Sequence, residues 1–361
     1  MAGMLFNEDG FEESESLITE AYERGELPEV RFRRHSSFEP PEPDLELIFA
    51  GITVWGELLT QWATPKDADL AFERVLNSGG ASFLRSTTRS PIRNLVICGD
   101  HRVDIKETSR ASSDVQMLSD GRVIQVAGRA RWTPDGGEKN AGLYSPEGDL
   151  LKEACVGDGI AKMYTDAEDR LWVGYFDEGV LGNYGWGSLW DEKTEQYHPT
   201  EPPIGEPGLN RYTADLSLDW SYPGDTKGAP WICDIYALNV GLKGVWNCSY
   251  TDFAVTRIVG DEVEVICKEG PAASYLVADD ERFAALYPYD LDVFNYGVRV
   301  PEGIEHRGIG TLRSPEGKPL KHCYLDAHDD VLYAICGNEI WKLDLQEIAR
   351  LDRGALDRWY G

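Results

Sequence analysis

The sequence predicts an all-β protein, a β-propeller of six four-stranded antiparallel blades, with five or seven blades as alternatives. Three observations predict this fold: a repeated hairpin pattern, the spacing of the repeats, and the lack of 3.6-residue periodicity in the repeated segments. An apolar content of 42% in 361 residues is sufficient to bury a large core.

Five segments share one pattern, a short apolar-rich run, a polar turn and a second run rich in aromatic and β-branched residues. They are anchored at Gln116, Tyr164, Tyr236, Tyr275 and Tyr324. The pattern is typical of a β-hairpin. Most spacings between the anchors match the roughly 40–50 residues of a four-stranded propeller blade.

In each repeat, a second hairpin-like module follows the first hairpin. Residues 142–153 and 310–321 are near duplicates, and both contain the tetrapeptide Ser-Pro-Glu-Gly, at Ser145 to Gly148 and at Ser314 to Gly317. Proline fixes φ and glycine accepts a left-handed conformation, so the tetrapeptide favours a tight turn. We therefore expect two hairpins, and hence four strands, in each repeat.

The ends of the chain complete the predicted ring. Residues 45–110 predict one further blade, interrupted by a helix around Lys66 to Asn77. The last repeat supplies about three strands, so we expect the N-terminal segment to add the fourth and leave no unpaired edge. The sequence thus predicts an extension over 1–44, which contains a short acidic helix at 11–25. The propeller follows over 45–346, with an aromatic insertion near 182–230, and a tail covers 347–361.

Residues 166–175, DAEDRLWVGY, resemble the repeat of bacterial two-component-regulator sensor propellers, whose pattern is roughly D-x-x-G-x-L-W-V-G-T. Asp169 stands where the pattern has glycine, and Tyr175 stands where it has threonine. NHL-type and gluconolactonase-like propellers share the same turn pattern. The resemblance implies a propeller architecture and transfers no activity, because a fold alone does not fix function.

The formal charge is −28, from 63 acidic and 35 basic side chains. Such a charge repels phosphate backbones and anionic lipids, so we expect neither nucleic-acid nor membrane binding. The first residues do not resemble a secretory signal, and no apolar run reaches the length of a membrane-spanning helix. The seven cysteines are dispersed without a C-x-x-C pair, which predicts buried reduced thiols in a cytoplasmic protein. The sequence makes no prediction of the oligomeric state.

Three acidic clusters, at Asp166 to Asp169, at Asp279-Asp280 and at Asp326 to Asp330, occupy the same turn of the repeat. Aspartate is favoured in such turns because its side chain caps its own backbone. We therefore expect solvated turns there and no metal site. His328, within the third cluster, is less usual at a turn.

Two loops that break the repeat concentrate carboxylates, amides and aromatic rings. The candidate binding residues are Asp177, Glu178, Asn183, Tyr184, Trp186 and Trp190 in the first loop, and Tyr287, Tyr289, Asp290, Asp292 and Asn295 in the second. Exposed rings beside carboxylates suit stacking on sugars, peptide side chains or planar ligands. The alternative, that the rings of the insertion pack together as a small core of their own, stays open.

Motifs for a nucleophile elbow, a zinc metalloprotease helix and a phosphate-binding loop are missing from the sequence. The leading prediction is a non-catalytic recognition scaffold without a cofactor. It would bind a protein, or a polyhydroxylated or cationic small ligand, on an acidic and aromatic face. No catalytic residue is assigned.

The alternative is a lactonase-like or glycosidase-like hydrolase or lyase. It would use a divalent cation such as Ca²⁺, or a carboxylate pair, in the central channel. Its working residues would be Asp177, Glu178, Asp290 and Asn295.

Overall fold

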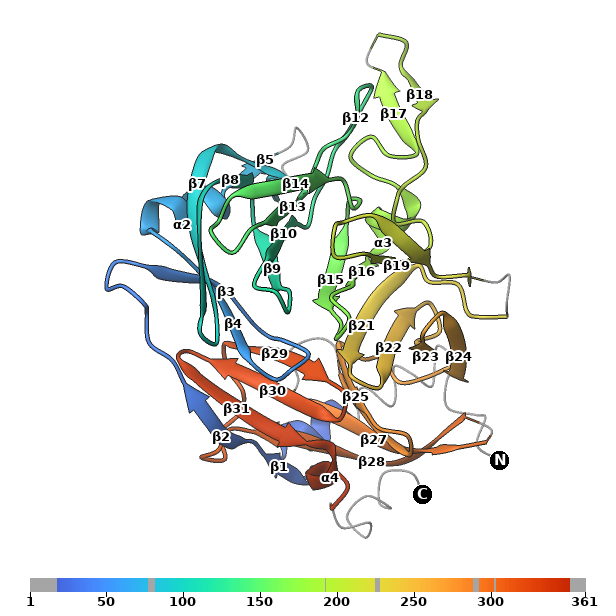
Figure 1. Cartoon of the computed structure of the whole chain (residues 1–361). Helices are drawn as coiled ribbons and strands as arrows, with labels where there is room; N and C mark the ends of the chain where they lie inside the picture. The colour runs from blue at the N-terminus through green and yellow to red at the C-terminus, as the bar shows by residue number, and fades with distance from the viewer. Residues whose placement is uncertain are drawn as a thin grey trace.

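A computed structural model describes residues 18–76, 82–191, 193–224, 228–287, 292–301 and 303–350 of the chain. Six four-stranded antiparallel blades surround a central channel (Figure 1). The predicted propeller with six blades is therefore confirmed. We number the blades in chain order from the blade that begins with β3.

The first three blades carry extra elements between their second and third strands. Blade 1 contains β3 (Glu46–Ile52), β4 (Leu58–Ala63), β7 (Thr87–Cys98) and β8 (His101–Arg110), with α2 (Pro65–Ala71), β5 (Arg74–Leu76) and β6 (Ser82–Leu84) inserted. Blade 2 contains β9 (Ser113–Met117), β10 (Val123–Ala127), β13 (Ala141–Tyr144) and β14 (Leu150–Ala154), with β11 (Trp132–Thr133) and β12 (Gly136–Gly137) inserted. Blade 3 contains β15 (Ile160–Thr165), β16 (Leu171–Tyr175), β19 (Leu209–Tyr212) and β20 (Leu218–Ser221), with α3 (Asp177–Leu181), β17 (Ser188–Asp191) and β18 (Gln196–Pro199) inserted.

The last three blades are plainer. Blade 4 contains β21 (Asp234–Gly241), β22 (Gly244–Tyr250), β23 (Ala254–Val259) and β24 (Glu262–Cys267). Blade 5 contains β25 (Tyr275–Ala278), β26 (Arg282–Leu286), β27 (Val293–Val300) and β28 (Gly303–Arg313). Blade 6 contains β29 (Cys323–His328), β30 (Val331–Cys336) and β31 (Glu339–Asp344), and is followed by α4 (Leu345–Ile348).

The N-terminal segment closes the ring. β2 (Arg33–Ser37) pairs antiparallel with β31 as the fourth strand of blade 6, which confirms the expected closure. β1 (Glu29–Arg31) pairs parallel with β28 on the outer edge of blade 5. Of the acidic helix predicted over 11–25, the described part is helical at 18–23, and Ala21 is buried against blade 5.

The core lies between neighbouring blades, because each sheet buries both faces against the next. Leu143 of blade 2 and Val173 of blade 3, for example, belong to one buried cluster. Local chemistry sets the ends of the inserted elements. Thr64 caps α2 by accepting a hydrogen bond from the Asp67 amide, and Pro65 occupies the first turn, where no amide is needed.

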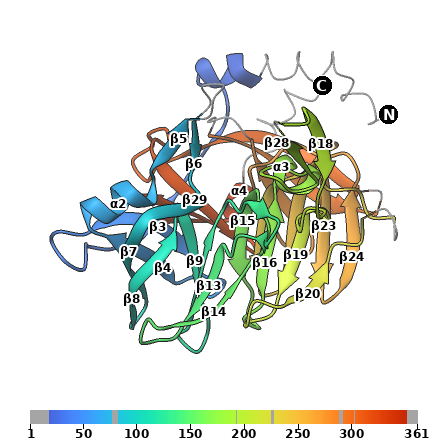
Figure 2. The same cartoon turned by 90° about the horizontal axis from the view of Figure 1, so that it is seen from above.

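The two faces of the ring differ. The chain reverses on one face after the first and third strands of each blade, for example at 118–122 and 145–149, and we call this the turn face. It reverses on the other face after the second strand and passes to the next blade after the fourth, and we call this the loop face. The helix at 18–23, α3 and β18 lie on the same side of the ring (Figure 2).

Two expectations need correction. Residues 182–230 contain β19 and β20, which belong to blade 3, so the excursion from that blade is narrower than the predicted insertion. A disulfide joins Cys323 to Cys336 across β29 and β30, so the expectation of seven reduced thiols was wrong for these two cysteines. The other five are free thiols.

Candidate functional site

Both predicted loops lie on the loop face, because each follows the second strand of its blade. The loop after β16 belongs to blade 3 and the loop after β26 belongs to blade 5. The structure therefore places them on one face, with blade 4 between them.

The loop of blade 3 brings four of its predicted residues around one cavity of about 710 Å³, which we call the hairpin hollow. It is lined by Arg131, Trp132, Gly182, Asn183, Tyr184, Gly185, Trp186, Ser188, Leu189, Trp190 and Tyr197. A cavity of this volume with aromatic walls is in the range of small-molecule and peptide sites.

Trp186 and Tyr184 form the base of the hairpin hollow. The Trp186 ring is buried, and its Nε1 donates a hydrogen bond of 2.8 Å to the Ala130 carbonyl of blade 2. The guanidinium carbons of Arg129 and Arg131 lie 4.5 Å and 5.4 Å from the centre of the Tyr184 ring. These two aromatic residues therefore fasten the loop to blade 2.

Trp190 and Tyr197 behave differently. They are paired across β17 and β18, and their ring centres lie 5.0 Å apart. Trp190 is 47% exposed, Tyr197 is 70% exposed, and the neighbouring Leu189 is 44% exposed. The β17–β18 hairpin stands away from the ring (Figure 1), so it presents these three side chains to solvent.

The carboxylates of the same loop are used unequally. Glu178 forms an ion pair of 2.5 Å with Arg129, which also contacts Asp158 at 3.0 Å. Burial raises the pKa of Asp158 to about 6, although Arg129 opposes this rise. Asp177 is exposed and accepts a hydrogen bond from the Glu178 amide. Glu178 is therefore engaged inside the protein, and Asp177 alone stays available to a ligand.

The loop of blade 5 borders a different cavity of about 790 Å³, which we call the mouth hollow. Its lining comprises Tyr22, Lys162, Tyr236, Ser274, Tyr275, Leu286, Tyr287, Asp292, Leu312, Pro319, Leu320, Lys321, His322, Cys323 and Leu325. Two of the predicted residues, Tyr287 and Asp292, are among them. Tyr289 and Asp290 lie outside the described residues.

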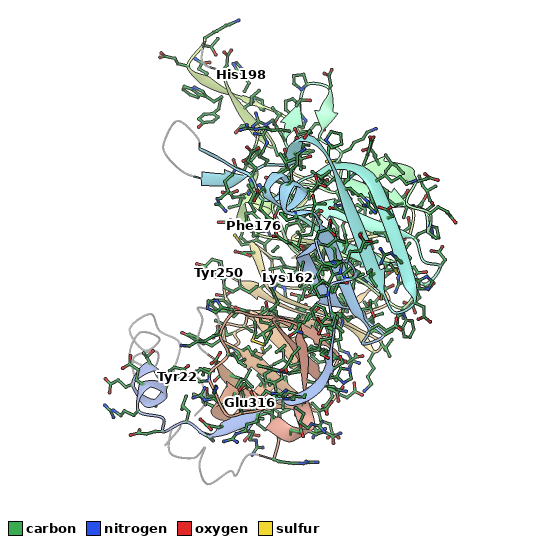
Figure 3. The ribbon with its side chains drawn as sticks, turned by 90° about the vertical axis from the view of Figure 1, so that its left-hand side faces the viewer. Tyr22, Lys162, Phe176, His198, Tyr250 and Glu316 are labelled. Carbon is green, nitrogen blue, oxygen red and sulfur yellow. A yellow bond between two sulfur atoms is a disulfide. The ribbon has the colours of Figure 1, made fainter. Side chains whose placement is uncertain are left out.

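Asp292 and Asn295 are placed as structural residues. The Asp292 carboxylate accepts a hydrogen bond of 2.8 Å from the Leu320 amide and lies 3.8 Å from Arg313, and burial raises its pKa. Asn295 is buried within β27. The two loops thus share a face but line separate hollows, and Tyr22 and His198, one from each region, lie at opposite ends of that side (Figure 3).

The prediction of a solvated turn was wrong for Asp326 and His328, which lie in β29 and are buried at the centre of the ring. His328 makes a 2.7 Å hydrogen bond from each ring nitrogen, to the carbonyls of Val240 and Ile52. Carbonyl oxygens only accept, so both nitrogens donate and His328 is an imidazolium. Asp326 lies 3.7 Å away and accepts a hydrogen bond from the Ile52 amide.

Asp166 and Asp279 cap their own turns as expected, although Asp166 is buried and not solvated. Asp166 accepts hydrogen bonds from the Glu168 and Arg170 amides, and Asp279 accepts them from Glu281 and Arg282. Each carboxylate caps its own turn, as aspartate commonly does.

Asp114 of β9 and Lys162 of β15 were missed by sequence reasoning. Asp114 lines a third cavity of about 320 Å³, which we call the arginine hollow because Arg74, Arg85 and Arg129 also line it. Lys162 lines the mouth hollow and lies at the middle of the ring (Figure 3). The available signal was a charged residue inside the first strand of a repeat, where neighbouring side chains are buried.

Metal binding receives no support from the part of the chain that the structure describes. Within it, no group of three or more His, Cys, Asp or Glu side chains is arranged to hold a metal ion. Among the residues of the cation-dependent alternative, Glu178 is paired with Arg129 and Asn295 is buried. Within the same described residues, no helix is long and apolar enough to cross a membrane.

No family model matches the chain. No curated protein matches it either. Among solved structures, the chain is similar to the extracellular domain of the putative one component system BT4673 from B. thetaiotaomicron, with a TM-score of 0.39 and 8% identity over 86% of this chain and 40% of that chain. It is also similar to Kluyveromyces lactis Hsv2, with a TM-score of 0.41 and 6% identity over 88% of this chain and 79% of that chain.

A third similar structure is regucalcin, a calcium-binding protein from Agrobacterium tumefaciens, with a TM-score of 0.39 and 9% identity over 88% of this chain and 95% of that chain. The propeller architecture implied by the resemblance of residues 166–175 is confirmed by the six four-stranded blades. The chain spans 40% of the length of the BT4673 extracellular domain. At these identities and TM-scores, the likenesses carry no argument about ligand or activity.

Proposed function

We propose that the chain is a recognition scaffold that binds a partner protein through the β17–β18 hairpin on its loop face. The observation that carries the proposal is the exposed cluster of Leu189, Trp190 and Tyr197 beside the hairpin hollow. Clustered exposed aromatic residues are uncommon on a surface that stays in water, and Trp and Tyr dominate binding energy at protein interfaces.

The shape of the region supports a protein partner. The hairpin stands clear of the blades (Figure 1), so a large partner reaches it without a clash with the ring. Its base is rigid, because Trp186 is buried and bonded to Ala130. A rigid base lowers the entropy lost when the exposed side chains are immobilised on binding.

Charge narrows the class of partner. A chain with a formal charge of −28 attracts basic surfaces over long range and repels acidic ones. We therefore propose a partner with an apolar patch bordered by lysine and arginine residues. The proposal favours an oxidising compartment over the cytoplasm that the sequence predicts, because a disulfide such as Cys323–Cys336 is typical of such a compartment.

The experiment compares three tagged full-length proteins in the native host: the wild type, the double variant Trp190→Ala/Tyr197→Ala, and Trp55→Ala. Trp55 is 57% exposed between β3 and β4 on the turn face, so it is a matched control for the loss of an exposed ring. Proteins that are enriched with the wild type and with the control are purified, and their affinities are measured by calorimetry at two salt concentrations.

The double variant is expected to bind the purified partner at least about 30-fold more weakly, which corresponds to the loss of one interface hot spot. Affinity should also fall as salt rises, because the charge attraction is screened. Equal binding by all three proteins, or no enrichment above background, would overturn the proposal.

A further inference from the structure

Asp114 and Lys162 are opposite charges that face the channel from the neighbouring strands β9 and β15. Each shifts the pKa of the other, so they lie within reach of their electric fields. Among the described residues, however, neither side chain makes a hydrogen bond or an ion pair within 4.0 Å. The strands β9 and β15 are in contact, and the two charges therefore interact across them without a direct bond.

The surroundings make this separation costly. The Asp114 side chain is exposed to the hollow that it lines, and desolvation by the surrounding walls raises its pKa to about 6, against the attraction of Lys162. Burial lowers the pKa of Lys162, although Asp326 and Asp114 oppose this fall. A charge removed from bulk water without a partner is unfavourable, and complementary charges on a ligand would compensate both groups.

The residues around Lys162 do not supply that compensation. Its ammonium lies 4.4 Å from the centre of the Tyr275 ring, a contact that leaves its hydrogen-bond donors unused. Asp326, the strongest charge acting on Lys162, is already bonded to the Ile52 amide and paired with the His328 imidazolium. Lys162 is therefore fixed in position with its donors available.

Asp114 and Lys162 line two different cavities. Asp114 and Met163 line the arginine hollow of about 320 Å³, whereas Lys162, the residue next to Met163, lines the mouth hollow of about 790 Å³. Both volumes are suitable for a small molecule. Consecutive residues of β15 thus line the two hollows, Met163 the arginine hollow and Lys162 the mouth hollow.

The mouth hollow is suited to an apolar or flat group. Four tyrosines line it together with four leucines; the tyrosines are Tyr22, Tyr236, Tyr275 and Tyr287. Aromatic walls favour stacking and edge-to-face contacts with a ring.

We propose that this channel site binds a free α-amino acid, or another small zwitterion, with an aromatic or branched side chain. The ligand's ammonium lies against the Asp114 carboxylate, its carboxylate lies against the Lys162 ammonium, and its side chain occupies the mouth hollow. The site is separate from the β17–β18 hairpin, so this proposal and the proposed protein partner stand or fall independently.

Three probes with one carbon skeleton test the proposal by calorimetry on the full chain. L-phenylalanine carries both charges, 3-phenylpropanoate lacks the ammonium, and 2-phenylethylamine lacks the carboxylate. L-phenylalanine should bind with a Kd of about 1 mM or tighter, and each single-charge analogue should bind at least about tenfold more weakly.

Two variants and their matched controls locate the site. Asp114→Asn and Lys162→Met should each weaken L-phenylalanine binding at least about tenfold. Asp215→Asn and Lys152→Met make the same chemical changes in a surface pair 3.6 Å apart and should leave the affinity unchanged. Both channel variants remove a charge and nearly keep the side-chain shape, so we expect them to fold.

The proposal is overturned if L-phenylalanine does not bind, if either single-charge analogue binds as tightly, or if the channel variants bind as well as the controls. Water alone would then occupy the space between Asp114 and Lys162.

Discussion

The two ends of the central channel contain similar charged residues, which are hydrogen-bonded at one end and lack a direct bond at the other. Towards the turn face, the side chains of His328, Asp326 and Asn239 form hydrogen bonds to the backbone of other blades. Towards the loop face, Asp114 and Lys162 interact through their charges but form no direct bond. We call the first the locked end and the second the open end. The comparison shows that residue type does not distinguish a structural polar group from a binding group, whereas its set of partners does.

The largest expected effect is at the locked end. His328→Ala removes two hydrogen bonds and leaves the buried Asp326 charge without its partner, so it should lower the free energy of unfolding by about 3 kcal/mol or more. Urea denaturation measures this loss. His101→Ala, at an exposed histidine that begins β8, is the control and should change the free energy of unfolding by less than about 0.5 kcal/mol.

The same histidine gives a pH dependence. Burial disfavours the imidazolium, but Asp326 and the two carbonyls outweigh it and raise the pKa of His328. Its stabilising contribution is therefore complete below the unfolded pKa of about 6.5 and is lost as pH rises through the higher folded value. Wild-type stability should fall above neutral pH more than that of His328→Ala. If the unfolding free energies of the two proteins changed in parallel with pH, the His328 imidazolium would not be what stabilises the locked end.

A smaller effect is expected at Asp329, which joins the turns of two blades that are far apart in the chain. Its carboxylate accepts hydrogen bonds from the Leu242 and Lys243 amides of blade 4. Asp329→Asn keeps the left-handed backbone accessible and turns one acceptor into a donor, so it should cost about 1.5 kcal/mol of unfolding free energy. Asp280→Asn changes a more exposed residue in the matching turn of blade 5 and should cost less. Equal losses of unfolding free energy in the two variants would show that the bonds of Asp329 to blade 4 add no stability.

The smallest effect has the opposite sign and lies at the open end. The pKa of Asp114 is raised to about 6 in the folded chain, so the folded state binds its proton more tightly than the unfolded state. Stability is therefore lost as pH rises from about 4 to about 6. Without ligand, Asp114→Asn should raise the unfolding free energy at neutral pH by about 1 kcal/mol. This value is reduced because water in the channel screens the charge. Near pH 4 the substitution should change the unfolding free energy little.

Urea denaturation at the two pH values checks this gain. Asp215→Asn is its control, because hydrogen bonding to Thr213 lowers the pKa of Asp215. A loss of stability in Asp114→Asn at neutral pH would mean that Asp114 is a structural residue.

The fold was accessible from the sequence because its repeats are visible. The five anchors fall in the first strands of blades 2 to 6, and closure by the N-terminal segment followed from the need to cover an edge. The duplicated tetrapeptides show the limit of such alignment. Ser145 to Gly148 form the turn between β13 and β14, whereas Ser314 to Gly317 connect β28 to β29 of the next blade.

The sites were less accessible, for two physical reasons. Asn183, Tyr184 and Trp190 were found together because they belong to one loop, and the structure gathers them around the hairpin hollow. Asp114 and Lys162 come from different blades, so their proximity depends on the curvature of the ring. Asp326 and His328 were assigned to a turn because the exact end of β29 depends on strand register, which local composition does not fix.

The most direct test of the difference between the two ends is a crystal structure of the full chain with L-phenylalanine. The ligand's amino nitrogen is expected within hydrogen-bond distance of the Asp114 carboxylate, and its carboxylate at Lys162, with the bonds of His328 to Val240 and Ile52 unchanged. A ligand bound elsewhere, or a direct Asp114–Lys162 ion pair that closes the gap, would contradict the assignment of the open end as a binding site.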